Sequence, residues 1–251
     1  MTASLWLLAG DASTLSTSLE LERLLGDGER QHAASFGSAE RRAQYTVGRG
    51  VLRQLLSSML NVPSTEIELV VEPTGRPRLH PKHQSNLSFS ISHTQNLVCW
   101  ALHPQSAIGV DTEPLQRPRD VGSLAARFFH TRERDYVDAA RSEQDASRRF
   151  LQCWTLKEAW FKAFAGSKSL VLSELGFDFD SATKQVTPIH ARPTSELQLW
   201  SSELTQQGLG EHVLALAWQS RNADVRCWRL NSSTLSPESL RLKPAFQFPA
   251  E

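Results

Sequence analysis

The sequence predicts an α+β protein made of two similar halves, and the order of its elements carries this prediction. A helical pattern followed by strand-like runs occurs in residues 1–113 and again in residues 114–251. The chain has 251 residues, which exceeds a typical domain of about 150 residues. Its 40% hydrophobic and 22% charged residues are typical of a folded protein. No residue-level repeat links the halves, so the boundary near residue 113 rests on element order alone.

In the first half we expect a strand within residues 1–10 and then one long helix. From Arg41 to Leu60, apolar residues recur at helical spacing, and Asn61-Val62-Pro63 ends the pattern. Four strand-like runs follow, separated by turn-rich stretches. They are Ile67–Val71, Leu87–Ser92, Leu97–Leu102 and Ala107–Asp111.

The second half repeats this order after a link that contains Pro and Arg, Pro114 to Asp120. A long helical segment is expected to end near Gly166, and four strand candidates follow it. They are Leu175–Phe179, Leu197–Trp200, His212–Trp218 and Val225–Leu230. The tail from Asn231 onward is rich in Ser and Pro, so we expect it to run extended over the surface.

Composition and charge disfavour several classes of function. The 27 basic and 27 acidic residues give a net charge of zero, so there is no global basic field to hold a nucleic acid. The three cysteines form no CxxC pair, which indicates neither a disulfide framework nor a cysteine zinc site and makes a reducing cytoplasm the expected location. The apolar Leu5–Leu8 is too short for a signal peptide or a membrane span. We therefore expect neither a nucleic acid nor a membrane as partner.

Two carboxylates end the last predicted strand of the first half. Strand alternation places Asp111 and Glu113 on one face, opposite Ile108 and Val110. Like charges this close repel, so the pair needs a cation or a shared proton, and hard oxygen ligands suit magnesium. An exposed acidic strand end is the alternative interpretation.

A third carboxylate lies on the predicted helix of the second half. The apolar stripe of this helix consists of Phe150, Leu151, Trp154 and Phe161. At about 100° per residue, Glu158 falls inside that stripe. Burying an unpaired charge costs several kcal/mol, so Glu158 needs a cationic partner, and Lys162 is the nearest one along the helix. A plain helix pair is the alternative, and for Lys157 a ligand contact and a solvated side chain both stay open.

A histidine ends the predicted strand that contains Phe89 and Ile91. Alternation turns these two side chains inward and places Ser90 and Ser92 on the other face before His93 emerges. The chain has no GxSxG sequence, so the serines do not indicate nucleophilic catalysis. A donor to an anionic ligand is the better functional interpretation of His93, and a structural histidine at a turn is the alternative.

Several basic residues could contact a phosphate. Gly75-Arg76-Pro77 is a turn that presents an arginine. The predicted first helix carries further arginines, although an amphipathic helix has such residues for solubility alone. The arginines on the predicted first helix are Arg41, Arg42, Arg49 and Arg53. Neither a Walker A nor a GxGxxG sequence is present, so a nucleotide would be held by side chains and turns.

Taken together, four ordered motifs resemble those of the 4'-phosphopantetheinyl transferases of the large, Sfp-like class. They are Gly75-Arg76-Pro77, Phe89–Thr94, Ile108–Glu113 and Trp154–Lys162. The stretch Ala126–Phe129 with Glu133 also looks like this family. The chain departs from the family pattern at Arg76, where lysine is usual, at Ser90, where asparagine is common, and at Thr94, where serine is common. All three residues keep the polarity or charge of the position.

The resemblance implies a pseudo-dimer of two α+β subdomains, each a helix packed on a small, mostly antiparallel sheet, with the site between them. It implies a monomeric enzyme of the cytoplasm. It also implies Mg²⁺-dependent transfer of the 4'-phosphopantetheine arm of coenzyme A to a serine of an apo acyl or peptidyl carrier protein, with release of 3',5'-ADP.

The resemblance also implies roles for individual residues. Asp111, Glu113 and Glu158 would hold the magnesium, and Glu158 would act as the base, alone or through a water. Lys162 would stabilise the departing phosphate as a compact point charge. His93 and Arg76 would hold the 3'-phosphate and the adenine end. Further candidate contacts to coenzyme A are Ser92, Lys157 and an arginine among Arg41, Arg42 and Arg49.

A carrier contact and two other functions stay open at this point. The candidate carrier surface is Phe128 and Phe129, rimmed by Arg117, Arg119, Arg132 and Arg134. Two core phenylalanines on a basic helix are the alternative. A magnesium-dependent nucleotide phosphohydrolase could use the same carboxylates, and a non-catalytic module could bind coenzyme A or a carrier. The presence of all three carboxylates together with Lys162 weighs against the non-catalytic module.

Overall fold

Strands that are apolar on both faces give this protein its layered structure. In β1 (Ala3–Ala9), Leu5 and Leu7 belong to a core between two sheets, whereas Leu8 packs with the long helix α3 (Ala39–Leu60). Because both faces of such a strand are covered, its sequence is almost continuously apolar. The computed structural model describes residues 2–73, 75–116, 120–165, 172–189, 196–206, 208–221 and 223–249.

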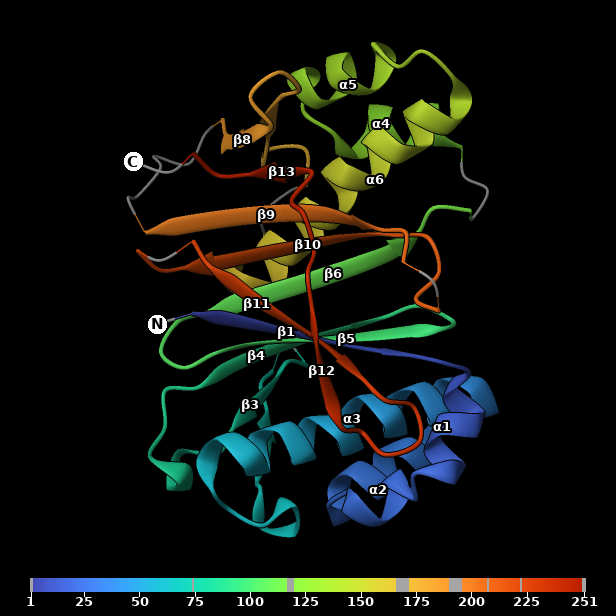
Figure 1. Cartoon of the computed structure of the whole chain (residues 1–251), viewed down its shortest axis with the longest axis vertical. Coiled ribbons are helices and arrows are strands. Elements are labelled where there is room, and N and C mark those ends of the chain that lie inside the picture. Colours follow the sequence, from blue (N-terminus) through green and yellow to red (C-terminus); the bar gives the residue numbers. More distant parts are fainter. Residues whose placement is uncertain are drawn as a thin grey trace.

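Helices cover the outer faces of the two sheets, which gives four layers in the order helix, sheet, sheet, helix (Figure 1). α3 covers the first sheet, and α6 (Glu143–Trp160) covers the second. α3 begins after Ser38, whose hydroxyl accepts the Arg41 N–H at 3.4 Å. It ends at Asn61, which adopts a left-handed conformation with φ 54°. The predicted helix over residues 41–60 is confirmed.

The first sheet has five strands in the order β12, β11, β1, β5 and β4. The bounds not yet given are β4 Ser88–His93, β5 Leu97–His103, β11 Val225–Leu230 and β12 Pro237–Leu240. All neighbours are antiparallel except β1 and β11, which are parallel. A strand from the second half of the chain therefore completes the first sheet.

The second sheet has six strands in the order β6, β10, β9, β13, β8 and β7. Their bounds are β6 Ile108–Pro114, β7 Phe177–Asp180, β8 Gln185–Pro188, β9 Leu197–Leu204, β10 His212–Gln219 and β13 Phe246–Gln247. Only β13 and β8 run parallel among these neighbours. β2 (Leu69–Val71) and β3 (Pro77–Leu79) form a separate two-stranded ribbon.

Shorter helices surround these layers. They are α1 Ala12–Ser18, α2 Asp27–Ser35, α4 Val121–Phe128, α5 Thr131–Asp138 and the 3₁₀ turns Leu21–Leu24, Ser64–Glu66 and Pro81–His83. A π-helical turn, Phe161–Ala165, follows α6. The predicted end of the helical segment near Gly166 lies outside the described residues. None of the described helices is long and apolar enough to cross a membrane.

The predicted α+β fold is confirmed, but the sheets exchange strands across residue 113. β6 lies within residues 1–113 and belongs to the second sheet, whereas β11 lies within residues 114–251 and belongs to the first. Each predicted strand run overlaps an observed strand. An apolar run indicates a buried strand and does not say which strand pairs with it. The boundary at residue 113 therefore stays a prediction.

The tail after Asn231 differs in part from the expected surface path. β12 extends the first sheet, and β13 pairs with both β9 and β8 in the second. Phe246 is only 3% exposed and packs in the core beside α6. Ser and Pro did not indicate these strands, because backbone pairing over a few residues needs no particular side chain.

Candidate active site

Serine side chains join two strands that belong to different sheets. β4 and β6 share no sheet, yet Ser90 Oγ accepts the Val110 N–H at 3.1 Å. Ser92 Oγ accepts the Thr112 N–H at 3.3 Å and donates to Asp111 Oδ1 at 2.9 Å. The predicted alternation along β4 is confirmed, since these serines lie on the face opposite the core beneath α3. The seam between the sheets therefore orients the carboxylate of Asp111.

Lys162 pairs with Asp111 and not with the helix neighbour expected from the sequence. Its Nζ lies 2.8 Å from Asp111 Oδ1 and 3.1 Å from the Val110 carbonyl. The sequence predicted Glu158 as the partner, four residues earlier on one helix. Lys162 lies instead in the π turn after α6, where the wider turn no longer continues the α-helical register.

The three predicted carboxylates influence one another. Burial raises the pKa of Glu158, the negative charge of Asp111 raises it further, and Glu113 adds to the effect while Lys162 opposes it. One oxygen of Asp111, Oδ2, is buried without a hydrogen-bond partner among the described residues. A cluster of carboxylates with an unpartnered oxygen has the donor chemistry that Mg²⁺ prefers.

Within the described part of the chain, however, no group of three His, Cys, Asp or Glu side chains has the arrangement of a metal centre. Lys162 already occupies Oδ1 of Asp111, so the ammonium group supplies part of the positive charge that the carboxylates need. The donor chemistry therefore fits a magnesium ion, while the side chains do not form a coordination shell. Magnesium binding by Asp111, Glu113 and Glu158 stays a prediction.

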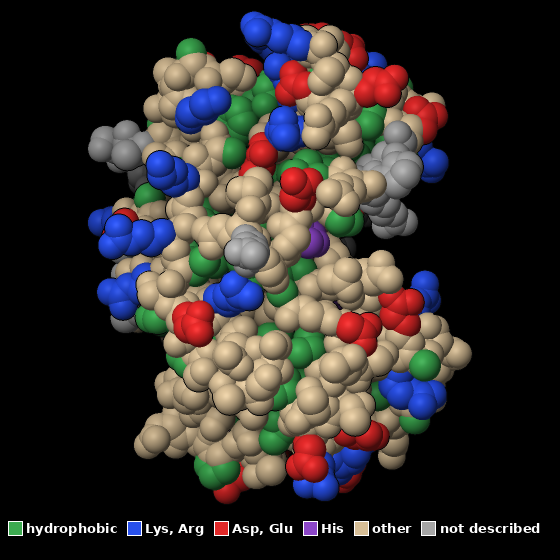
Figure 2. Space-filling model, turned by 45° about the vertical axis from the view of Figure 1, so that its right-hand side comes forward, with side chains coloured by type: hydrophobic (Ala, Val, Ile, Leu, Met, Phe, Trp, Pro, Cys, Tyr) green, Lys and Arg blue, Asp and Glu red, His purple; other side chains and the backbone are tan. Residues whose placement is uncertain are grey.

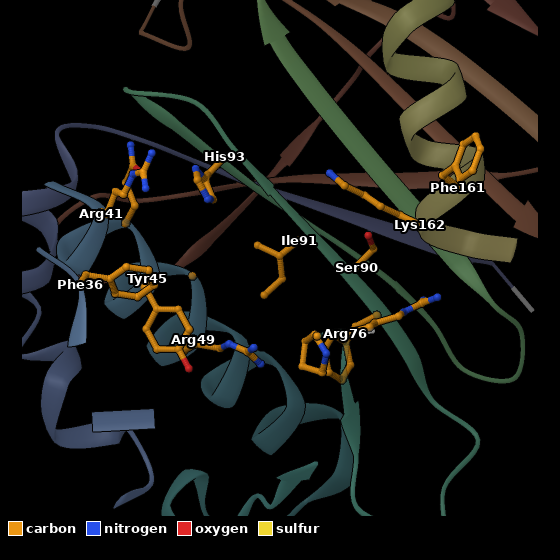
Figure 3. A pocket seen from close by; sticks show the side chains of 15 residues that line it. Phe36, Arg41, Tyr45, Arg49, Arg76, Ser90, Ile91, His93, Phe161 and Lys162 are labelled. Atoms are coloured by element: carbon orange, nitrogen blue, oxygen red, sulfur yellow. The ribbon is translucent and has the colours of Figure 1, made fainter. Parts of the chain in front are cut away.

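A cavity of about 850 Å³ lies beside these carboxylates and is lined by residues of both halves. Its basic side chains are Arg41, Arg49, Arg76, His93 and Lys162, and none of the described residues that line it is Asp or Glu. Figure 3 shows Arg41 and Arg49 on one side and Arg76 and Lys162 on the other, with Ile91 between them. We call this space the cationic cavity. Its charge and its apolar walls suit an anion that also carries an aromatic or aliphatic part.

Arg49 is the most distinctive side chain of the cationic cavity. It is 8% exposed, its Nη1 is buried without a partner in the described structure, and its guanidinium lies 5.3 Å from the centre of the Tyr45 ring. Arg41 also lines the cavity, whereas Arg42 is exposed and does not. Arg41, Tyr45 and Arg49 are spaced four residues apart on α3, a signal that would have selected these two arginines from the sequence.

Arg76 and His93 both line the cationic cavity, as expected, but they differ in their other contacts. Arg76 donates to the Ile108 carbonyl at 3.2 Å and the Ala163 carbonyl at 3.4 Å, so it ties the turn before β3 to the second half. Burial lowers the pKa of Arg76. The His93 side chain keeps an exposed surface, yet desolvation by the surrounding protein lowers its pKa, and the charge of Lys162 lowers it further. His93 is therefore mainly neutral near pH 7.

The structure corrects the prediction for Lys157. Its side chain is fully buried, and Nζ lies 2.8 Å from Glu133 Oε2 in the core beneath α6. It is neither solvated nor a wall of the cationic cavity. The physical reason is that position 157 faces α5, whose Glu133 is itself fully buried and supplies the opposite charge. Spacing along one helix could not reveal a partner from another.

The candidate carrier surface is corrected in part. Phe129 is 3% exposed and stacks on Phe150, so it is a core residue. Phe128 is partly buried and meets the edge of Trp154. Arg117 and Arg119 lie outside the described residues. A carrier contact at Phe128 and the remaining arginines stays a prediction.

Comparison with protein families now identifies the kind of protein that carries this site. A model described as "4'-phosphopantetheinyl transferase superfamily" matches residues 107–217, and one described as "4'-phosphopantetheinyl transferase, N-terminal" matches residues 13–105. The chain belongs to the 4'-phosphopantetheinyl transferase family. The two matches include β4, β6 and α6, so they cover both sides of the seam.

Three curated proteins illustrate the relationship. The 4'-phosphopantetheinyl transferase HetI of Nostoc sp. is 37% identical over 57% of this chain and 61% of its own length. The phosphopantetheinyl transferase of Thraustochytrium sp. is 30% identical over 69% of this chain and 64% of its own. The human L-aminoadipate-semialdehyde dehydrogenase-phosphopantetheinyl transferase is 26% identical over 64% of this chain and 55% of its own length. The match spans less than two thirds of each of these relatives.

Proposed function

We propose that this phosphopantetheinyl transferase family member transfers the 4'-phosphopantetheine arm of coenzyme A to a serine hydroxyl of an apo acyl or peptidyl carrier protein, releasing 3',5'-ADP. The observation that carries the proposal is the cationic cavity beside three carboxylates. Coenzyme A has a phosphorylated nucleotide at one end and a diphosphate in the middle. A cavity rich in basic side chains offers complementary charge for the phosphorylated nucleotide. The neighbouring carboxylate cluster offers a place for a cation beside the diphosphate.

In this proposal the anionic nucleotide lies between α3 and the π turn after α6. Arg49 donates a hydrogen bond from its unpartnered Nη1 to a phosphate oxygen. A buried N–H group without an acceptor is unfavourable, and the phosphate supplies that acceptor. Arg41, His93 and Arg76 also line the cationic cavity and add donors. The ring of Tyr45 offers an apolar face to the base.

The diphosphate then lies near Asp111, Glu113 and Glu158, which would hold Mg²⁺. When bound, the ion would neutralise charge on the diphosphate oxygens. Lys162 holds Asp111 in the free protein and is placed to donate to a phosphate oxygen. Glu158 accepts the proton of the carrier serine, directly or through a water, because a neutral hydroxyl is a poor nucleophile.

The test is to incubate the purified chain with coenzyme A, Mg²⁺ and an apo carrier protein, and to measure the mass of the carrier. An acyl carrier and a peptidyl carrier are tested separately, each with a control in which the acceptor serine is replaced by alanine. A mass gain of one phosphopantetheine on the serine-containing carrier alone supports the proposal. Cleavage of the nucleotide without modification of the carrier would indicate a phosphohydrolase, and binding without turnover would indicate a non-catalytic module.

A further inference from the structure

We propose that a second cavity, which has no Lys or Arg among its described lining residues and lies on the far side of the β4–β5 turn, binds the pantetheine arm of coenzyme A through its amide groups. This inference rests on the proposed function and extends it, since it assigns a place to the part of the substrate that the cationic cavity does not explain. We call this space the amide cavity, with a volume of about 460 Å³. Its lining residues include Gln95, Asn96, Gln116, Glu211 and His212.

A third space shares lining residues with both. This bridging cavity, of about 470 Å³, is lined by His93, Thr94, Gln95, Thr112, Glu113 and Pro114. His93 also lines the cationic cavity, while Thr94, Gln95 and Pro114 also line the amide cavity. A path therefore leads from the nucleotide side past Glu113 to the amide cavity.

The ends of several strands bring these spaces together. In Figure 1 the β4–β5 turn, the end of β6 and the β9–β10 loop lie on the same side of the molecule. Figure 2 turns this side forward and shows the surface hollowed between the two halves. The path thus runs along the seam that the serines of β4 and the backbone of β6 hold together.

Charge changes along the path in the order that coenzyme A requires. The cationic cavity has Arg and Lys but no acid among its described lining residues, and the bridging cavity has Glu113, beside which the proposed Mg²⁺ would supply the positive charge for the diphosphate. The amide cavity, as far as its described residues go, has no Lys or Arg and one acid, Glu211. Coenzyme A is anionic at its nucleotide, carries its diphosphate next, and ends in a neutral chain with two amides. A second phosphate group would lack a cationic partner in the amide cavity.

The hydrogen-bonding groups of the amide cavity also suit an amide chain. Gln95, Asn96 and Gln116 carry carboxamides, which both donate and accept hydrogen bonds. Gln116 Nε2 donates to Glu211 Oε2 at 3.1 Å, so this side chain is already oriented. A purely aliphatic ligand would bury such groups without replacing their bonds to water. An amide-bearing chain replaces them.

His212 anchors the wall between the bridging and amide cavities. It is 6% exposed, and its Nε2 lies 3.2 Å from Thr94 Oγ1, so β10 holds the turn that follows His93. Its Nδ1 is buried, and the backbone of Leu209 and Gly210 interacts with the ring from the β9–β10 loop. Gly210 packs directly on the ring, since a Cβ there would lie 3.0 Å from His212 Cε1. The amide cavity therefore has one wall that β10 and the β9–β10 loop hold in place.

The test compares coenzyme A with adenosine 3'-phosphate 5'-diphosphate, which keeps both phosphates of the diphosphate and lacks only the pantetheine arm. Isothermal titration calorimetry with Mg²⁺ measures the Kd of both ligands for the full chain and for a Gln95→Leu/Gln116→Leu double variant. We expect the Kd of coenzyme A to rise about fivefold, because hydrogen bonds to the arm are lost, and that of the nucleotide to stay unchanged. The matched control is Gln144→Leu, an exposed glutamine on α6 outside all three cavities.

A measurement on the unmodified protein covers the case in which the double variant fails to fold. The imidazole NMR signals of His212, assigned with a His212→Gln variant, should shift when coenzyme A is added and stay in place with adenosine 3'-phosphate 5'-diphosphate. Equal loss of affinity for both ligands, no loss for either, or equal shifts of His212 would overturn the placement of the arm. Wild-type protein that binds neither ligand and modifies no carrier would instead refute the proposed function.

Discussion

Replacing Lys157 by Met is expected to destabilise the folded protein by about 3–5 kcal/mol at pH 8, the usual cost of breaking a buried ion pair. Lys157 Nζ contacts Glu133 Oε2 at 2.8 Å, and it also donates to the carbonyls of Leu172, at 2.9 Å, and Leu175. Its three ammonium hydrogens therefore all have acceptors. Both charged side chains are fully buried, so solvent screening does not reduce the cost.

The cost should depend on pH, because the variant leaves the Glu133 carboxylate buried without its cation. Burial raises the pKa of Glu133 from 4.5 to about 7, although Lys157 and the backbone N–H groups of His130 and Phe177 oppose the shift. Loss of Lys157 raises this pKa further. An acid whose pKa is higher in the folded than in the unfolded chain destabilises the fold as pH rises between the two values. We therefore expect a smaller cost at pH 5 than at pH 8.

Urea unfolding followed by tryptophan fluorescence at pH 5 and pH 8 measures both quantities. The matched control is the Glu133→Gln/Lys157→Met double variant, which removes both charges and should lose most of the difference between the two pH values. Cys153 also faces the pair from α6, but burial raises its pKa, so its thiol stays neutral throughout. A cost below about 1 kcal/mol at pH 8, or the same cost at both pH values, would refute the buried ion pair as the structural role of Lys157.

Three further substitutions test the site and its framework. Glu158→Gln should abolish carrier modification and leave the urea midpoint nearly unchanged, whereas activity near the original level would contradict its assignment as ligand and base. Arg49→Met should raise the Kd of 3',5'-ADP at least about tenfold through lost charge-assisted hydrogen bonds. The exposed Arg42→Met is its control, and equal effects would contradict the placement. Gly109→Ala should lower the free energy of unfolding by about 3 kcal/mol or more in thermal unfolding, because an ideal Cβ would lie 1.9 Å from the Ala159 carbonyl oxygen. A variant as stable as the original protein would disprove this close packing.

The sequence predicted those features that follow from periodicity within one element. Alternation along residues 107–113 placed Asp111 on the face opposite Val110, and Val110 indeed packs in the core between the sheets. The buried position of Glu158 followed from helical spacing, and its side chain is partly buried beside the other carboxylates. Both predictions depend only on geometry that repeats along a strand or a helix.

Features that depend on contact between elements could not be predicted in the same way. Lys157 is buried because Glu133 approaches from α5, and Lys162 pairs with Asp111 because a π turn changes the register after α6. β11 joins the first sheet as a parallel neighbour of β1, and nothing in Val225–Leu230 indicates that partner. Each of these outcomes is decided by where a distant segment lies.

The seam between β4 and β6 explains why the site depends on the packing of the two halves. Ser90 and Ser92 bond the backbone of β6, and the same Ser92 hydroxyl holds Asp111. Arg76 crosses the seam to the Ile108 carbonyl, while Lys162 reaches Asp111 from the end of α6. A shift of one sheet against the other would therefore break the bonds that orient the site. A ligand that contacts residues on both sides of the seam binds only when the two sheets are aligned. Its binding free energy therefore stabilises that alignment, and the alignment in turn favours binding of the substrate.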